Sequence, residues 1–175
     1  EFLREATVRE DVDHPDRNII GITREEHHST AEEVMKILPR APYESICSAE
    51  EAEITKYAGN TFLYLKVVYM NMLYDLAQTF GGDWETVAKN VSADHRIGNS
   101  HMYPVHASGH SKDSGRGAGG HCFIKDFAAF ADLYKKNVQD AVGHELFTAI
   151  ERKNISLLRA SGKDLGLLEE VYGRA

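Results

Sequence analysis

The sequence predicts a mainly α-helical fold built around one long helix, preceded by the trailing edge of an α/β domain. Apolar residues recur at three-and-four spacing from Ser48 to Phe80, the pattern of one continuous helix. Ahead of this segment, two short apolar runs flank a shorter helical pattern. That strand, helix, strand order is typical of an α/β domain.

The composition is that of an ordinary globular chain. It has 175 residues, of which 42% are hydrophobic and 27% charged, and a net charge of -7. No basic cluster is present, so we expect no nucleic-acid partner. The apolar runs are interrupted by Lys66 and Asn71, so we expect no membrane span. A charged first segment and only two cysteines, Cys47 and Cys122, indicate a cytoplasmic protein with reduced thiols.

Residues 1–47 contain the expected α/β elements. A β-branched run at 18–22 predicts a buried strand, and a second short strand is expected at 43–47. Between them, residues 31–38 have helical spacing, with a cap expected at Ser29 or Thr30 and a stop at Pro39.

The long helix is expected to open on the capping box S-A-E-E, which begins at Ser48, and to end before Gly81-Gly82. Its length, about 45 Å at helical rise, exceeds what a small domain needs. Apolar residues lie on more than one side of it, so we expect it to form a homodimer with a second copy.

Shorter helices are expected after it. One should begin at Asp83 as N-cap, one near Cys122, and one should cover residues 139–160. Residues 96–120 form a Gly, Ser and His-rich segment without a period, which predicts a loop. The tail, 161–175, is expected to add a last helical turn or a docking arm.

The segment GRGAGGHCFIKD, residues 115–126, admits three interpretations. Gly115, Gly117 and Gly120 satisfy G-x-G-x-x-G, but the preceding HASGHSKDS is no buried strand, which disfavours a dinucleotide-binding loop. A second interpretation is a metal site. Its candidate ligands are zinc-compatible but match no familiar spacing: His101, His106, His110, His121 and Cys122.

The third interpretation is a nucleophilic cysteine. At a helix start, the helix dipole and free N–H groups favour the thiolate of Cys122, and Lys125 adds positive charge. Asp126 can orient water, and the glycines allow a substrate to approach the backbone. The alternative is that Cys122 only packs a tight junction between loop and helix.

Four motifs, taken together, resemble those of one enzyme family. Gly117 to Asp126, G-A-G-G-H-C-F-I-K-D, is similar to the G-x-G-G-S-C-x-x-K-D segment of the UDP-glucose 6-dehydrogenase and GDP-mannose dehydrogenase family. The other three stand in the family's order: E-F-L-R-E at 1–5 with P-D-R-N-I-I-G behind it, E-I-T-K-Y-A-G-N-T-F at 53–62, and D-H-R-I-G-N at 94–99.

The resemblance implies a domain plan. Family members carry an N-terminal Rossmann domain for NAD, a central helical region with a dimerisation helix, and usually a C-terminal nucleotide-sugar domain. On that plan, residues 1–47 are the end of the NAD domain, 48–160 the central domain and 161–175 a tail. NAD is then bound mainly by a domain absent from this chain, and the chain alone is expected to be inactive. A non-catalytic dimerisation module is the alternative, and a His-rich metal-binding helical protein a more distant one.

The resemblance also implies a four-electron oxidation of a nucleotide sugar through a covalent cysteine intermediate. It assigns catalysis to Cys122, Lys56, Asn60, Asp126 and Glu5. It assigns substrate binding to Glu1, Leu3, Arg96 and Gly119, with Arg96 reaching into the neighbouring subunit, and cofactor contact to Lys125. It assigns no metal ligand. His121 replaces the family's serine, and which nucleotide sugar is the substrate stays open.

Overall fold

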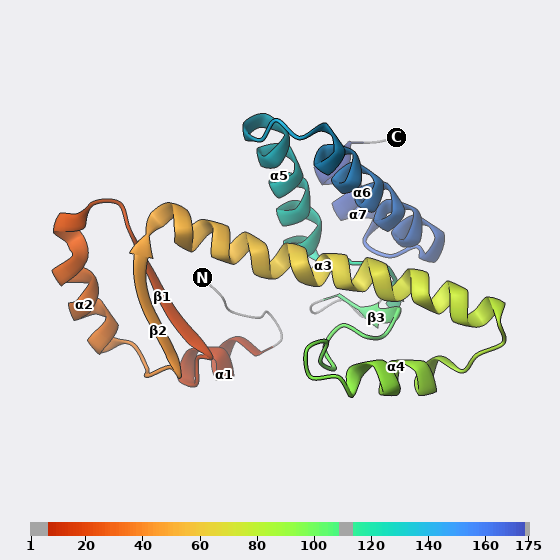
Figure 1. The fold of residues 1–175 in the computed structure, drawn as a ribbon, viewed down its shortest axis with the longest axis horizontal. Coiled ribbons are helices and arrows are strands. Elements are labelled where there is room, and N and C mark those ends of the chain that lie inside the picture. Colours follow the sequence, from red (N-terminus) through yellow and green to blue (C-terminus); the bar gives the residue numbers. More distant parts are fainter. Residues whose placement is uncertain (1–6, 109–113, 174–175) are drawn as a thin grey trace. The chain divides into compact units, whose positions relative to one another are not determined.

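The computed structural model describes residues 7–108 and 114–173, which form two compact units divided after Gly59, inside the long helix. Seven α-helices, one 3-10 helix and four short strands are present in the described part (Figure 1). The expected mainly helical fold, with one long helix after a small parallel sheet, is confirmed.

The first unit contains the expected strand, helix, strand order. Strands β1 and β2 pair in parallel, with Arg17 opposite Tyr43 and Ile22 opposite Ser48, and α2 lies against both (Figure 1). The elements of this unit ahead of the long helix are α1 (Val8–Asp13), β1 (Arg17–Ile22), η2 (Glu25–His27), α2 (His28–Ile37) and β2 (Tyr43–Ser48).

The start of α2 differs from the expectation. A 3-10 turn, η2, runs directly into the helix, so the N-cap is His27, which makes no side-chain capping bond. Ser29 and Thr30 therefore lie inside the first turn, and the expected cap at either residue was wrong. The end is as expected: Leu38 is extended because the residue before Pro39 is kept out of the helical region.

Helix α3 (Ala49–Thr79) is the long helix. Its capping box is formed: the Ser48 amide donates to Oε2 of Glu51 over 2.9 Å, and the Glu51 amide donates to Oγ of Ser48 over 3.2 Å. At the other end Gly81 adopts a φ of 69°, and the Gly82 amide donates to the Ala77 carbonyl over 2.8 Å. The glycine pair closes the helix because it reaches the left-handed conformation without strain.

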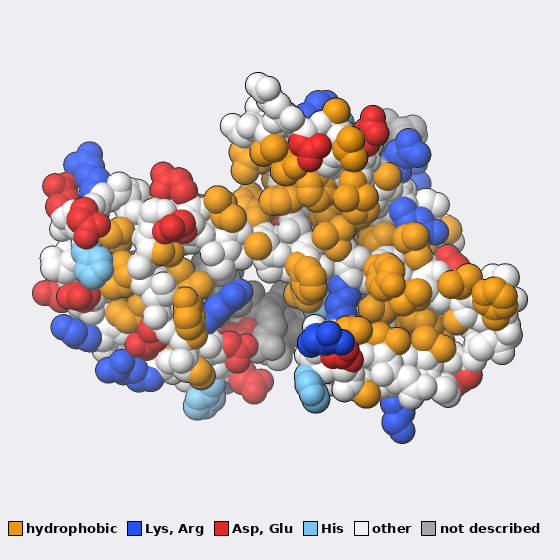
Figure 2. All heavy atoms as spheres, viewed as in Figure 1, with side chains coloured by type: hydrophobic (Ala, Val, Ile, Leu, Met, Phe, Trp, Pro, Cys, Tyr) orange, Lys and Arg blue, Asp and Glu red, His pale blue; other side chains and the backbone are white. Residues whose placement is uncertain are grey.

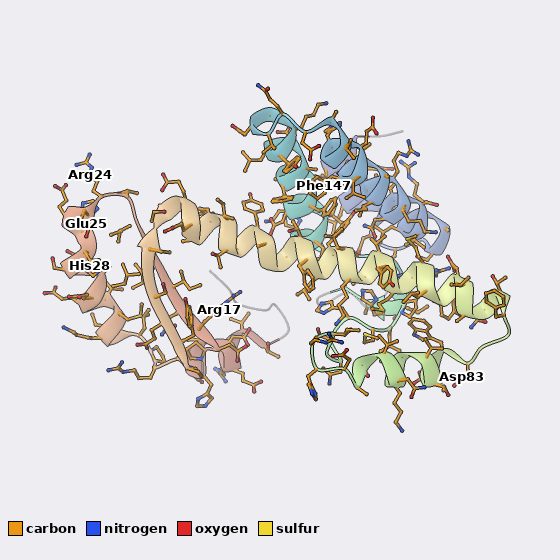
Figure 3. The ribbon with its side chains drawn as sticks, in the orientation of Figure 1. Arg17, Arg24, Glu25, His28, Asp83 and Phe147 are labelled. Atoms are coloured by element: carbon orange, nitrogen blue, oxygen red, sulfur yellow. The ribbon has the colours of Figure 1, made fainter. Side chains whose placement is uncertain are left out.

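The second unit continues with short helices and a small hairpin. Asp83 caps α4, accepting from the Thr86 amide at 2.9 Å (Figure 3), and Asp140 caps α6 in the same way through the Gly143 amide at 3.0 Å. The tail forms the last helix, α7. The elements are α4 (Trp84–Ser92), β3 (Val105–Ala107), β4 (Ser114–Arg116), α5 (His121–Asn137), α6 (Ala141–Ser161) and α7 (Leu165–Tyr172).

The segment 96–120 is not the featureless loop that was expected. Strands β3 and β4 pair antiparallel, with Val105 opposite Arg116 and Ala107 opposite Ser114. Each strand has three residues, too few to produce a readable alternation of polar and apolar side chains.

The core of the second unit is built where α3 meets α5, where α3 meets α4, and where α5 meets α6 and α7. Tyr64 of α3 stacks on Phe127 of α5, with ring centroids 3.9 Å apart. Phe147 of α6 packs its ring against Phe127, Phe130 and Tyr134 (Figure 3). No described helix is both long and apolar enough to cross a membrane.

Candidate active site

Cys122 is the second residue of α5, and its side chain is exposed. The residue before the helix, Gly120, has a φ of 84°, which a glycine adopts freely and which turns the chain into the helix. Asp126 follows Cys122 by four residues, so the two side chains share a face of α5. The thiol therefore opens to solvent one turn from a carboxylate.

Asp126 itself is buried, with 4% of its surface exposed. Its Oδ2 accepts a hydrogen bond of 2.6 Å from the side-chain amide of Asn60 on α3, and its Oδ1 lies 2.5 Å from Nζ of Lys125. A buried carboxylate needs such partners, because its hydration is lost. The structure thus brings Asn60 and Asp126 together, with Cys122 one turn away.

Lys125 was expected to face the thiol of Cys122 or the cofactor. Its ammonium is directed to Asp126 with a side chain that is 43% exposed. Lys56 is half-buried on α3, one helical turn before Asn60, and belongs to the first compact unit. Three further expected residues, Glu1, Leu3 and Glu5, lie outside the described residues.

Arg96 lies in the turn that follows α4. Its side chain is 87% exposed, and its guanidinium pairs with Asp94, Nη2 to Oδ2 at 2.5 Å. Hydrogen bonding from Arg96 lowers the pKa of Asp94 and raises that of the guanidinium. Held by its neighbour, the arginine projects into solvent rather than onto the described surface around it.

The glycine loop, defined here as Gly115–Gly120, has its backbone held from α6 and the turn after it. The amide of Arg116 donates to Oγ of Ser161 over 3.0 Å, and that of Gly120 to Oδ2 of Asp164 over 2.8 Å. Asn154 bonds both the amide and the carbonyl of Ala118, at 2.7 and 2.9 Å.

This loop does not fit the pyrophosphate of NAD. A dinucleotide-binding loop offers free N–H groups between a buried parallel strand and a helix. Here three of the N–H groups already have protein acceptors, and the preceding strand, β4, belongs to an antiparallel hairpin. The disfavoured dinucleotide interpretation of Gly115, Gly117 and Gly120 is thus opposed by the geometry as well.

Lys163 also contacts the backbone of the glycine loop. Only 1% exposed, it donates from Nζ to the carbonyls of Gly117 and Gly115, at 3.1 and 3.4 Å. Burial lowers the pKa of Lys163 to about 8, while the charge of Asp164 acts in the opposite direction. Gly119 is enclosed: a Cβ there would lie 2.7 Å from Cε of Lys163 and 2.5 Å from Oγ of Ser108.

Sequence reasoning missed these polar contacts. Lys66 and Asn71 were noticed only as breaks in apolar runs, yet both are buried. Lys66 donates to the Ile97 carbonyl over 2.7 Å, and Asn71 accepts from Nε of Arg116 over 2.9 Å. A polar residue on the apolar face of a helix was the available signal, since burial there requires a partner.

The histidines remain dispersed in the described part of the chain. His101 and His106 are half-buried, and burial lowers the pKa of each. His121 is exposed, and His110 lies outside the described residues. Within 7–108 and 114–173, no three His, Cys, Asp or Glu residues come close enough to hold a metal ion.

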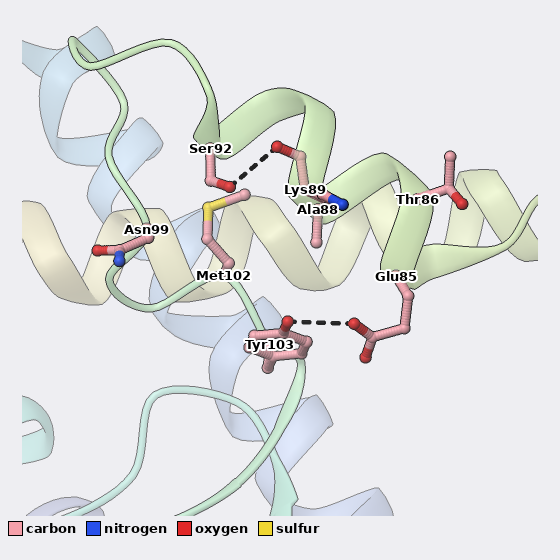
Figure 4. Close-up of a pocket in the computed structure, with 8 residues that line it drawn as sticks. All are labelled: Glu85, Thr86, Ala88, Lys89, Ser92, Asn99, Met102 and Tyr103. Atoms are coloured by element: carbon pink, nitrogen blue, oxygen red, sulfur yellow. Dashed lines mark hydrogen bonds between the residues drawn. The ribbon is translucent and has the colours of Figure 1, made fainter.

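A separate cavity of about 290 Å³ lies between α4 and the segment that follows it (Figure 4). The Tyr103 hydroxyl donates to Oε2 of Glu85 over 3.1 Å at its edge, and Met102 and Asn99 also line it. None of the residues expected in the catalytic or substrate sites is among its lining residues.

Comparison with known proteins shows which family has this sequence and fold. The central domain of the UDP-glucose/GDP-mannose dehydrogenase family matches residues 50–155. The solved structure of a UDP-glucose dehydrogenase from the hyperthermophilic archaeon Pyrobaculum islandicum superimposes with a TM-score of 0.73 at 34% identity, covering 99% of this chain and 36% of that chain. The fold and the sequence together define the central region of a dehydrogenase.

Two curated relatives agree with this class. A UDP-glucose 6-dehydrogenase of Rickettsia bellii is 30% identical over 155 residues, which cover 88% of this chain and 33% of the relative. Another, of Rhizobium meliloti, is 34% identical over 145 residues, covering 80% and 30%. The chain therefore belongs to the UDP-glucose/GDP-mannose dehydrogenase family, as its motifs indicated, and spans about a third of the length of these relatives.

Proposed function

We propose that this chain is the central, dimer-forming and cysteine-bearing part of an NAD-dependent nucleotide-sugar dehydrogenase. The reaction is the oxidation of a sugar C6 alcohol to the carboxylate, of the UDP-glucose to UDP-glucuronate type. One observation carries the proposal: exposed Cys122 lies in the first turn of α5, one turn from buried Asp126, whose carboxylate is fixed by Asn60. The names of the relatives support the substrate class.

NAD, held mainly by a domain outside this chain, would supply the chemistry of hydride acceptance in both oxidations. The residues of this chain act on the carbon being oxidised. The Cys122 thiolate adds to the aldehyde, forming a C–S bond and moving the carbonyl electron pair onto oxygen. Lys56 and Asn60 stabilise this oxyanion with an ammonium and an amide.

A thioester on Cys122 is the product of the second oxidation, and water must break its C–S bond. Asp126 accepts a proton from the attacking water, with Glu5 as the second candidate base. The carboxylate leaves and the thiolate is restored. Asn60 and Lys125 hold the two oxygens of Asp126 in place.

Around this centre, Glu1, Leu3 and Gly119 contact the nucleotide sugar, and Lys125 contacts NAD. Arg96 reaches the substrate site of the neighbouring subunit. The high exposure of its guanidinium supports that role, since an arginine turned to solvent can bind a phosphate of a ligand held elsewhere. Both cysteines are free, and we assign the protein to the cytoplasm.

The homodimer forms through α3. Five exposed apolar side chains follow one another at spacings of seven, three, four and four, so they share one side of the helix axis. Figure 2 shows hydrophobic side chains exposed along α3 in the second unit. The five are Phe62, Tyr69, Met72, Leu76 and, just beyond the helix, Phe80.

The decisive experiment replaces the nucleophile in the protein expressed from its full coding region. With NAD and UDP-glucose, Cys122→Ser is expected to lose nearly all acid formation, because a hydroxyl does not readily form the thioester. Cys47→Ser is the matched control and should keep wild-type turnover. Wild-type acid formation by Cys122→Ser would refute the covalent role.

The same assay addresses the alternative. Because the glycine loop does not fit NAD, a non-catalytic dimerisation module is the second candidate. A dimeric protein that forms no NADH with either UDP-glucose or GDP-mannose would support that candidate.

A further inference from the structure

Two consecutive residues, Lys163 and Asp164, join the turn after α6 to the glycine loop that precedes Cys122. Oδ2 of Asp164 accepts from the Gly120 amide over 2.8 Å, and Gly120 is the N-cap of the helix that carries the cysteine. Nζ of Lys163 donates to the carbonyls of Gly115 and Gly117. One residue pair therefore fixes the loop at three backbone positions.

The conformation of Asp164 shows that its side chain serves the loop. It stands at the N-cap of α7, where an aspartate commonly accepts from an amide of its own helix. It makes no such bond, and its backbone adopts φ 54° and ψ 32°, a left-handed conformation that is unfavourable for a residue with a Cβ. The carboxylate instead reaches Gly120, 44 residues earlier in the chain.

The side chain of Lys163 is also directed to the glycine loop. A lysine that is 1% exposed is unfavourable unless its ammonium finds acceptors, and here two of its donors have loop carbonyls as partners. Its methylenes pass beside Gly119, which has no room for a Cβ because Lys163 and Asp164 occupy that space. The low pKa of Lys163, about 8, follows from this burial.

We propose that Lys163 and Asp164 are positioning residues for the nucleophile: they hold the glycine loop and the first turn of α5 so that the thiol of Cys122 meets the aldehyde carbon. Neither touches the reacting atoms. The inference rests on the proposed function of Cys122, because positioning matters only if that thiol attacks. Displacement by about 1 Å can reduce the rate a hundredfold.

The test uses Lys163→Met, which keeps the chain length without the donors, and Asp164→Ala, which removes the acceptor. Asp164→Asn retains an acceptor oxygen and is the rescue variant. In the protein expressed from its full coding region, we expect kcat with UDP-glucose and NAD to fall about ten- to hundredfold in the first two, with KM changed far less. Asp164→Asn should recover most of kcat, and Glu170→Gln, an exposed change on α7, should have no effect.

Iodoacetamide provides a readout that is independent of turnover. In Lys163→Met and Asp164→Ala, alkylation of Cys122 should slow about threefold or more, while that of Cys47 stays constant. Wild-type kcat and wild-type Cys122 alkylation in both variants would overturn the positioning role. The role would also be overturned if kcat and Cys122 alkylation fell in both variants only in proportion to a loss of helical circular dichroism, because the proteins would then simply be unfolded. Failure of the proposed function is distinguishable, because Cys122→Ser would then form acid normally whatever the two variants do.

Discussion

Asn60 of α3 donates a hydrogen bond of 2.6 Å to Oδ2 of Asp126 on α5, across 66 residues of sequence. With Lys125 on Oδ1, both oxygens of this buried carboxylate have a protein partner. The bond therefore joins the core helices α3 and α5 close to Cys122, the proposed nucleophile, in addition to fixing the carboxylate.

Asn60→Ala is expected to lower the free energy of unfolding by about 1–3 kcal/mol, because it leaves an oxygen of buried Asp126 without its donor. Asn137→Ala makes the same change at an exposed side chain, which donates to the Leu133 carbonyl, and should cost less than about 0.5 kcal/mol. Urea unfolding followed by circular dichroism measures both. Equal losses in the free energy of unfolding would show that the Asn60 bond stabilises the fold no more than an exposed hydrogen bond does.

The elements that could be predicted from sequence are those with local causes. Periodicity and the S-A-E-E box predicted α3 from Ser48 to Phe80, and the structure places it at Ala49–Thr79 with the box formed. Asp83 was recognised as a cap because an aspartate opens the helical pattern there, and it does cap α4. The motifs predicted the family, which the comparisons confirm.

The elements that could not be predicted depend on distant partners. Nothing local to Lys163 indicates that its ammonium is buried against Gly115 and Gly117, some 46 to 48 residues earlier. The hairpin of β3 and β4 likewise forms by pairing across residues 108–113 rather than by any pattern within its strands. The Asn60 and Asp126 contact could be anticipated only through the family motifs, because the sequence holds the two 66 residues apart.

Gly119→Ala is expected to destabilise the second unit by about 1–3 kcal/mol, since the new methyl would overlap Oδ2 of Asp164 and crowd Lys163. Gly166→Ala is the matched control: a Cβ there meets nothing within 4 Å, and alanine favours the helix. Thermal unfolding of both variants provides the comparison. A Gly119→Ala protein as stable as Gly166→Ala would contradict the tight enclosure of the loop.

Leu76→Glu is expected to weaken the homodimer. Leu76 lies on the exposed apolar side of α3, and dimer formation would bury the new charge there. Gln78→Glu adds the same charge two residues on, away from that side, and should leave the dimer intact. Light scattering across a dilution series measures both. A wild-type chain that is monomeric at micromolar concentration would remove the dimer proposal altogether.

Stability should depend on pH through Lys163. Its folded pKa is about 8, below the ordinary 10.5, because burial disfavours the charged form. Above pH 8 the unfolded chain therefore binds more protons than the folded chain at this residue, so the contribution of Lys163 to the free energy of unfolding rises with pH. Asp164 and half-buried His106 are the charged or titratable neighbours that interact with it.

The comparison of wild type with Lys163→Met measures the titration of Lys163 together with its coupling to Asp164 and His106, since the other titrating residues are common to both proteins. From pH 7 to pH 9, the stability of the wild type relative to Lys163→Met should increase by on the order of 1 kcal/mol. Urea unfolding at pH 7, 8 and 9 gives the difference directly. A difference that is constant, or that falls as the pH rises, would mean that the folded chain holds the Lys163 proton as tightly as the unfolded chain does, or more tightly.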